Sequence, residues 1–193
     1  MATAISTEQL KELRLRTGAG IVDCRNALRQ AGGDLEKAAE ILRSKGLATA
    51  EKKAARTAGE GLIEAYIHTG GKLGAMVEVN CETDFVARTD EFRRLARDLA
   101  MQVAASAPRY VSREDVPSEA IEEQRARLSV ELAGKPASSL DGRLEKWYGE
   151  AVLLEQPFIK DEARRIKDVI TEAVARIGEN IQIRRFARFK IGD

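Results

Sequence analysis

The chain has 193 residues, of which 44% are hydrophobic and 33% are charged, so it can bury a substantial core in one or two domains. Its 32 basic and 31 acidic side chains nearly cancel, so no overall field favours nucleic acid or an anionic membrane. The N-terminus lacks a basic-then-apolar signal pattern, no segment reaches the roughly 20 apolar residues of a membrane span, and two cysteines are too few for a disulfide scaffold. These features predict a soluble, cytoplasmic protein.

Residues 1–46 predict three short helices. The first opens with Ser6 and Gln9 at the spacing of a capping box, and apolar residues follow three and four apart. The third begins after Asp34, a residue typical of helix N-caps, and is expected to end at Gly46. Three helices in so few residues predict a small N-terminal domain with a modest core.

Residues 47–60 are rich in Ala and Lys and predict a helical linker to a larger domain, residues 61–193. After Gly61 the apolar residues alternate in two runs joined by the glycine-rich HTGGKLG, which predicts a β-hairpin. Amphipathic helices follow, including a hairpin of two charged helices near residues 118–155 and a last helix that ends at Gly178.

The final run of the chain alternates again and predicts a strand. Its alternation places one set of apolar residues together and leaves Phe186 on the opposite face; that set is Ile181, Ile183, Ala187, Phe189 and Ile191. The order helices, hairpin, helices, strand predicts an α+β fold, in which a three-helix domain precedes an antiparallel sheet with packed helices.

The patterns of catalytic and metal sites are missing from the sequence. His68 is the only histidine, and no paired metal-ligand spacing surrounds it. The TGGKLG segment lacks the spacing of a phosphate-binding loop and lies in a predicted hairpin, where a tight turn explains it. Cys24 falls on the inner stripe of its helix, as a small buried hydrophobe would. We therefore expect no catalytic residue, no cofactor and no metal.

Nucleic-acid binding is the alternative that the last strand raises. This strand interleaves two phenylalanines with the basic residues Arg184, Arg185, Arg188 and Lys190, a mixture that could stack bases and bind phosphates. The same charges could instead protect an edge strand against aggregation. The balanced total charge disfavours nucleic acid as the main partner.

Five motifs in order resemble the elongation factor Ts family and span nearly the whole chain. They are LRLRTGAGIVDCRNAL at residues 13–28, NCETDFVAR at 80–88, AMQVAASAPRYV at 100–111, EQPFIKD at 155–161 and RIGENIQIRRF at 176–186. The resemblance implies a guanine nucleotide exchange factor for the GTPase elongation factor Tu, with no chemistry and no bound nucleotide of its own. It also implies a ubiquitin-associated-like N-terminal domain and, since only one core fits, the short form of the family, which acts as a homodimer.

The resemblance assigns the central role to the TDFV motif, Thr83, Asp84, Phe85 and Val86. In the family, the Asp-Phe pair enters the GTPase domain, separates two helices and disturbs the magnesium and phosphate site, so that GDP leaves. Taken alone, an aromatic residue at this position is more often part of a core. The exposure of Phe85 therefore distinguishes the two interpretations.

The resemblance also implies partner contacts elsewhere in the chain. In the N-terminal domain they are Arg14, Ile21, Val22 and Arg25; before the last strand they are Ile177 and Gly178; and in the hairpin His68 would act from the second subunit of the dimer. Simpler explanations exist for two of them, since Ile21 could be helix core and Gly178 could end a helix. No cysteine lies in the last strand, so subunits would associate by packing and strand pairing, or through Cys24 or Cys81.

Overall fold

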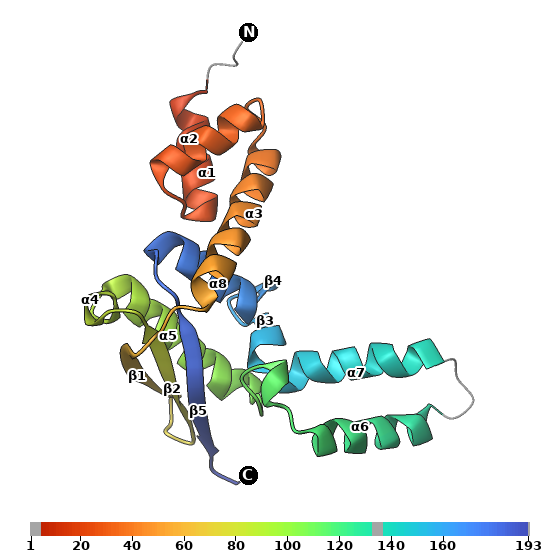
Figure 1. The fold of residues 1–193 in the computed structure, drawn as a ribbon. Helices are drawn as coiled ribbons and strands as arrows, with labels where there is room; N and C mark the ends of the chain where they lie inside the picture. Colours follow the sequence, from red (N-terminus) through yellow and green to blue (C-terminus); the bar gives the residue numbers. More distant parts are fainter. Residues whose placement is uncertain (1–4, 133–136, 193) are drawn as a thin grey trace.

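The computed structural model describes residues 5–132 and 137–192, and Figure 1 shows how their helices and strands are arranged. The chain begins with α1 (Thr7–Thr17), α2 (Ile21–Gln30) and α3 (Leu35–Ala54). The central part contains β1 (Glu60–Ile67), β2 (Leu73–Cys81), β5 (Gln182–Lys190), α4 (Asp84–Ala87), α5 (Asp90–Ser106) and α8 (Ile166–Ile177). The remainder comprises α6 (Ser118–Glu131), α7 (Ala137–Ala151), β3 (Pro157–Phe158), β4 (Asp161–Arg165) and the 3-10 turns η1 (Arg113–Asp115) and η2 (Leu153–Glu155). The predicted α+β fold is confirmed.

The N-terminal helices begin where their capping residues predict. The Ser6 hydroxyl accepts the N–H of Gln9 at 3.1 Å, and the Gln9 side chain accepts the N–H of Ser6 at 3.0 Å, which completes a capping box. Asp34 caps α3 by accepting the N–H groups of Glu36 and Lys37. The buried apolar side chains among the described residues of this unit are Leu13, Cys24, Ala27, Leu28 and Ala38. This core is small and separate from that of the sheet.

The third helix is longer than predicted, because Gly46 does not end it. α3 has 20 residues and continues as far as Ala54, so the first part of the predicted helical linker is helical but belongs to α3 itself. Gly46 is buried at the crossing with α8, where a Cβ atom on it would lie 3.4 Å from the Cβ of Ala175. A glycine inside a helix usually marks either its end or a close approach of backbones, and here the close approach explains it. The crossing attaches the N-terminal helices to the core.

The three-stranded antiparallel sheet has the order β1-β2-β5 and packs one face against helices (Figure 1). On this inner face Val77 and Val79 of β2 are fully buried, as are Phe92 and Leu99 of α5. α8 adds further apolar side chains to the same core, among them Ile166. The opposite face, called the outer face below, has no described helix over it and exposes Ile63, Ile67, Met76 and Phe189.

A β-bulge in β5 overturns the predicted alternation of the last strand. The pairing with β2 shifts between residues 78 and 79, which leaves Arg184 as an extra residue. Ile183 before the bulge is buried, and Phe186 after it packs against the same core. Phe189 is consequently turned to the outer face and is 70% exposed. The prediction that Phe189 shares a face with Ile183, and Phe186 does not, was therefore wrong.

The charged hairpin predicted near residues 118–155 is present as α6 and α7, which run side by side away from the sheet (Figure 1). Gly134 and Pro136, which lie between these helices in the sequence, fall outside the described residues. At the base of the hairpin the buried amide of Gln102 in α5 donates to the side chain of Gln156 at 3.1 Å.

In the described part of the chain, no helix is long and apolar enough to cross a membrane.

The crossing of α3 and α8 makes a prediction about Gly46. We expect Gly46→Leu to lower the free energy of unfolding by about 1–3 kcal/mol, because the larger side chain meets Ala175 in a packed crossing. Gly46→Ala is the matched control and should raise stability by up to about 1 kcal/mol, since its methyl group fits and alanine favours helix. Urea unfolding measures both. Equal stability of the two variants would contradict the close packing.

Candidate functional site

Phe85 lies on the surface, on a single helical turn between the sheet and α5. It is 77% exposed, whereas the next two residues, Val86 and Ala87, are buried in the main core. The turn is therefore anchored on one side and presents an aromatic ring on the other. This exposure excludes the interpretation of Phe85 as a core residue and makes Val86 the packing residue of the TDFV motif.

Two threonines and a cysteine hold the turn. The Thr83 hydroxyl caps α4 by accepting the N–H of Val86 at 3.3 Å, and the Thr89 hydroxyl donates to the carbonyl of Val86 at 2.8 Å. The thiol of Cys81 donates to the carbonyl of Thr83 at 3.2 Å. Burial raises the pKa of Cys81 to about 11, with a further increase from the negative charge of Glu179, so the thiol stays protonated and remains a donor.

Asp84 forms an ion pair with Arg88 one helical turn later. The two charged groups are 2.7 Å apart, and both side chains are more than half exposed. Such surface pairs contribute only about 0–1 kcal/mol. The carboxylate of Asp84 can therefore exchange Arg88 for a donor on another molecule with little loss of stability.

The residues after α8 hold the Phe85 turn from a distant part of the sequence. The carboxylate of Glu179 accepts the N–H groups of Glu82 and Thr83, both at 3.0 Å, and the Thr83 hydroxyl at 2.7 Å. In return the carboxylate of Glu82 accepts the N–H of Asn180 at 2.7 Å. Glu179 and Asn180 were not predicted as site residues. Both lie in the motif at residues 176–186, and their partners Glu82 and Thr83 lie in the motif at residues 80–88, but no spacing in the sequence pairs these two motifs.

Ile177 and Gly178 adjoin this contact. Ile177 is half-buried against the main core, and Gly178 ends α8 in a left-handed conformation with φ of +88°. The interpretation of Gly178 as a helix terminator is thus confirmed. Its carbonyl accepts a hydrogen bond from the ammonium group of Lys53 in α3.

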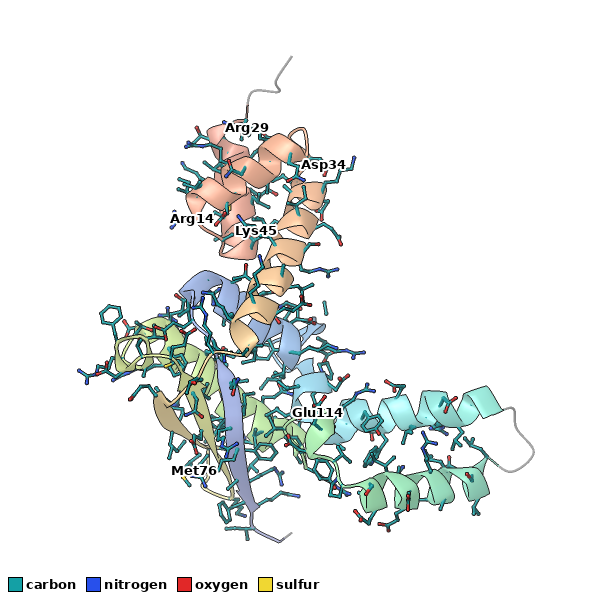
Figure 2. The ribbon with its side chains drawn as sticks, viewed as in Figure 1. Arg14, Arg29, Asp34, Lys45, Met76 and Glu114 are labelled. Atoms are coloured by element: carbon teal, nitrogen blue, oxygen red, sulfur yellow. The ribbon has the colours of Figure 1, made fainter. Side chains whose placement is uncertain are left out.

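The four predicted contact residues of the N-terminal helices are all exposed. Ile21 and Val22 open α2 with 48% and 63% exposure, and Arg14 and Arg25 are exposed as well. Figure 2 shows Arg14 at the surface of these helices. Ile21 is therefore not helix core, and the unit presents two adjacent apolar side chains together with two cations.

His68 lies far from Phe85 within one chain. It is exposed in the turn between β1 and β2, where its Nδ1 atom is 2.9 Å from the hydroxyl of Tyr66. Phe85 follows the opposite end of β2, and a strand of 9 residues spans about 30 Å. The fold does not bring these two predicted site residues together in a single subunit.

Comparisons with known proteins match this chain to members of one family. The family model described as Elongation factor TS matches residues 39–192. A curated protein of Carboxydothermus hydrogenoformans, named Elongation factor Ts, is 58% identical over 98% of this chain and 90% of its own length. Proteins of the same name from Caldanaerobacter subterraneus and Thermotoga petrophila are 56% and 53% identical, with 98% and 97% of their lengths covered.

The chain belongs to the elongation factor Ts family. Membership supports a role in nucleotide exchange during translation elongation. The family name implies an exchange factor rather than a catalyst. Among the described residues, no group of three or more histidine, cysteine or acidic side chains is placed to hold a metal ion.

The last strand offers little to nucleic acid in this fold. Arg185 pairs with Glu78 at 2.7 Å, and Arg188 donates to a backbone carbonyl of α5 at 3.0 Å. Phe186 packs against the core and leaves only Phe189 exposed on the strand to stack on a base. The stacking platform that the sequence suggested is therefore incomplete within the described residues.

The exposure of Phe85 predicts that its ring contributes little to folding. Phe85→Ala should change the free energy of unfolding by no more than about 0.5 kcal/mol, as surface substitutions usually do. Phe92→Ala is the matched control, because Phe92 is fully buried in α5, and it should lower stability by about 3–5 kcal/mol. Chemical denaturation compares the two. A large loss of stability in Phe85→Ala would contradict the exposed position of this ring.

Proposed function

We propose that this chain binds elongation factor Tu and accelerates the release of GDP by inserting Phe85 between helices of the GTPase domain. The observation that supports the proposal is a phenyl ring 77% exposed on a turn whose backbone is held on both sides. Large apolar side chains in this setting are a common feature of binding sites. Nothing about the packing of the free chain requires the ring to be there.

Insertion of Phe85 as a wedge between two helices of the partner is energetically favourable. Moving an exposed phenylalanine into an apolar pocket contributes about 1.5–3 kcal/mol, and a turn that is already ordered loses little conformational entropy on binding. Asp84 orients the ring by accepting hydrogen bonds from the partner in place of Arg88. Separation of the partner's helices then displaces groups that organise the magnesium ion and the phosphates, so the nucleotide loses charge-assisted contacts.

One side chain does not suffice for the whole effect. A thousandfold faster release of GDP requires a barrier about 4 kcal/mol lower, which is at or above the contribution of a single interface anchor. The exposed pair Ile21 and Val22, with Arg14 and Arg25 beside it, is proposed as the second contact with the GTPase domain. Because linkage is reciprocal, incoming nucleotide expels the factor as the factor expelled GDP.

The proposed functional unit is a homodimer built on the outer face of the sheet. Its residues form rows across the strands; one row is Ala65, Met76 and Ala187, and the next is Ile67, Gly74 and Phe189. The side chain of Ile67 covers Gly74, where a Cβ atom would lie only 2.6 Å from its Cδ1. A broad apolar face of this kind suits a two-fold contact with a second copy. The second subunit could then supply His68 to the GTPase that receives Phe85 from the first.

Release of a fluorescent GDP analogue from elongation factor Tu tests the exchange function. We expect strong acceleration by the wild-type chain and a loss of at least about tenfold in Phe85→Ala, as for removal of an interface anchor. Val130→Ala is the matched control, since Val130 is also an exposed apolar residue (81%) but lies on α6, and it should exchange at the wild-type rate. Acceleration that survives Phe85→Ala would refute the wedge, and no acceleration by the wild type would refute the exchange function.

A charge on the outer face tests the dimer. Met76→Glu should convert a dimer into a monomer in analytical ultracentrifugation, because a carboxylate would be buried without a partner. Ile21→Glu is the control, since Ile21 is equally exposed (48%) on the N-terminal helices, and it should remain a dimer. A monomeric wild-type chain at micromolar concentration, or a dimeric Met76→Glu variant, would contradict the proposed interface.

A further inference from the structure

The contact between the end of α8 and the start of α4 depends on hydrogen bonds to one carboxylate as well as on packing. Three hydrogen bonds from one short stretch converge on the single carboxylate of Glu179, and all three donors belong to Glu82 and Thr83. Hydrogen bonds to an ionised acceptor are about twice as strong as neutral ones. Glu179 therefore holds the backbone immediately before Asp84 and Phe85.

The Thr83 hydroxyl extends this hold into the turn itself. The hydroxyl donates to the carboxylate of Glu179, with 2.7 Å between the two oxygens. A lone pair of the hydroxyl oxygen then accepts the N–H of Val86 at 3.3 Å. The direction of the hydroxyl is thus set by Glu179, and the cap on α4 depends on that direction. Without the carboxylate the hydroxyl can rotate and the cap competes with water. Phe85 lies between the two residues that this cap connects.

Glu179 is itself held in place by its neighbour. The side chain of Asn180 is buried and donates to two carbonyl groups, that of Ala54 at the end of α3 at 3.3 Å and that of Arg56 just beyond it at 2.7 Å. Its backbone N–H donates to Glu82. The segment after α8 is therefore a fixed support on which the Phe85 turn rests, rather than a mobile connection.

We propose that Glu179 is a positioning residue for nucleotide exchange, acting through Thr83 on the direction in which Phe85 is presented. The inference rests on the proposed function, because it takes Phe85 as the group that enters the GTPase. Glu179 makes no contact with the partner in this account. Its removal leaves Phe85 in the chain but allows its turn to sample orientations that do not fit the pocket.

The test combines two measurements on Glu179→Ala and Glu179→Gln. In the free protein, amide hydrogen exchange of residues 82–86 should become about tenfold faster in Glu179→Ala, while that of β2 and α5 stays unchanged. GDP release from elongation factor Tu at saturating factor should become about tenfold slower. Glu179→Gln should lie between, since its amide oxygen keeps an acceptor of the same length. Glu123→Ala, an exposed glutamate on α6, is the control and should match the wild type in both measurements.

A double mutant separates positioning from direct contact. If Glu179 acts only through Phe85, adding Glu179→Ala to Phe85→Ala should slow GDP release by less than about twofold. A full tenfold further loss would overturn the proposal, because it would mean that Glu179 acts on the partner directly. Unchanged amide exchange at residues 82–86 in Glu179→Ala would also overturn it. If the wild-type chain failed to release GDP, the proposed function would fall, while amide exchange would still decide whether Glu179 holds this turn.

Discussion

The carboxylate of Glu179 and its three donors fix the segment after α8 to the start of α4, just beyond the last β2–β5 pair, Asn80 and Gln182. They join the end of α8 to the turn of Phe85, and Asn180 joins the same point to the end of α3. Since α3 carries the N-terminal helices, this polar contact and the α3–α8 crossing at Gly46 together link Phe85 to the exposed pair Ile21 and Val22. Because each donor is backbone or hydroxyl and the acceptor is charged, the polar contact is directional in a way that apolar packing is not.

The side chains that stabilise the fold differ from those proposed to bind partners. The core is built from residues such as Phe92 and Leu99, which are completely buried, whereas Phe85, Val22 and Phe189 are more than 60% exposed. Single exposed apolar side chains are common on protein surfaces, but these three lie on the surfaces proposed here for binding. The fold thus separates a surface proposed for the GTPase from an outer sheet face proposed for a second copy, at different ends of the β-hairpin.

The sequence predicted what depends on local pattern and missed what depends on approach between distant segments. Helix caps at Ser6 and Asp34 and the β-hairpin follow from short-range rules, and they were predicted correctly. Gly46 was misinterpreted, because a glycine that ends a helix and one that permits a close crossing look alike until Ala175 is seen beside it. The bulge at Arg184 moved Phe186 to the inner face and Phe189 to the outer face, because it depends on how β5 pairs with β2 and not on the alternation within β5. The hydrogen bond between Glu179 and Thr83 likewise has no signal in the sequence spacing. Phe85 was identified by family resemblance, since an aromatic residue taken alone is more often part of a core.

The central claim, that Phe85 enters the GTPase domain of elongation factor Tu, is tested most directly by a crosslink from position 85. A photoreactive benzophenone side chain at this position, irradiated in the complex, should attach to helices of the GTPase domain, and mass spectrometry would locate the site. The same group at Val130, equally exposed on α6, should give no crosslink in that domain. Attachment at position 85 to the GTPase domain is the result that this account predicts. Attachment to a second copy of the chain, or equal labelling from positions 85 and 130, would contradict it.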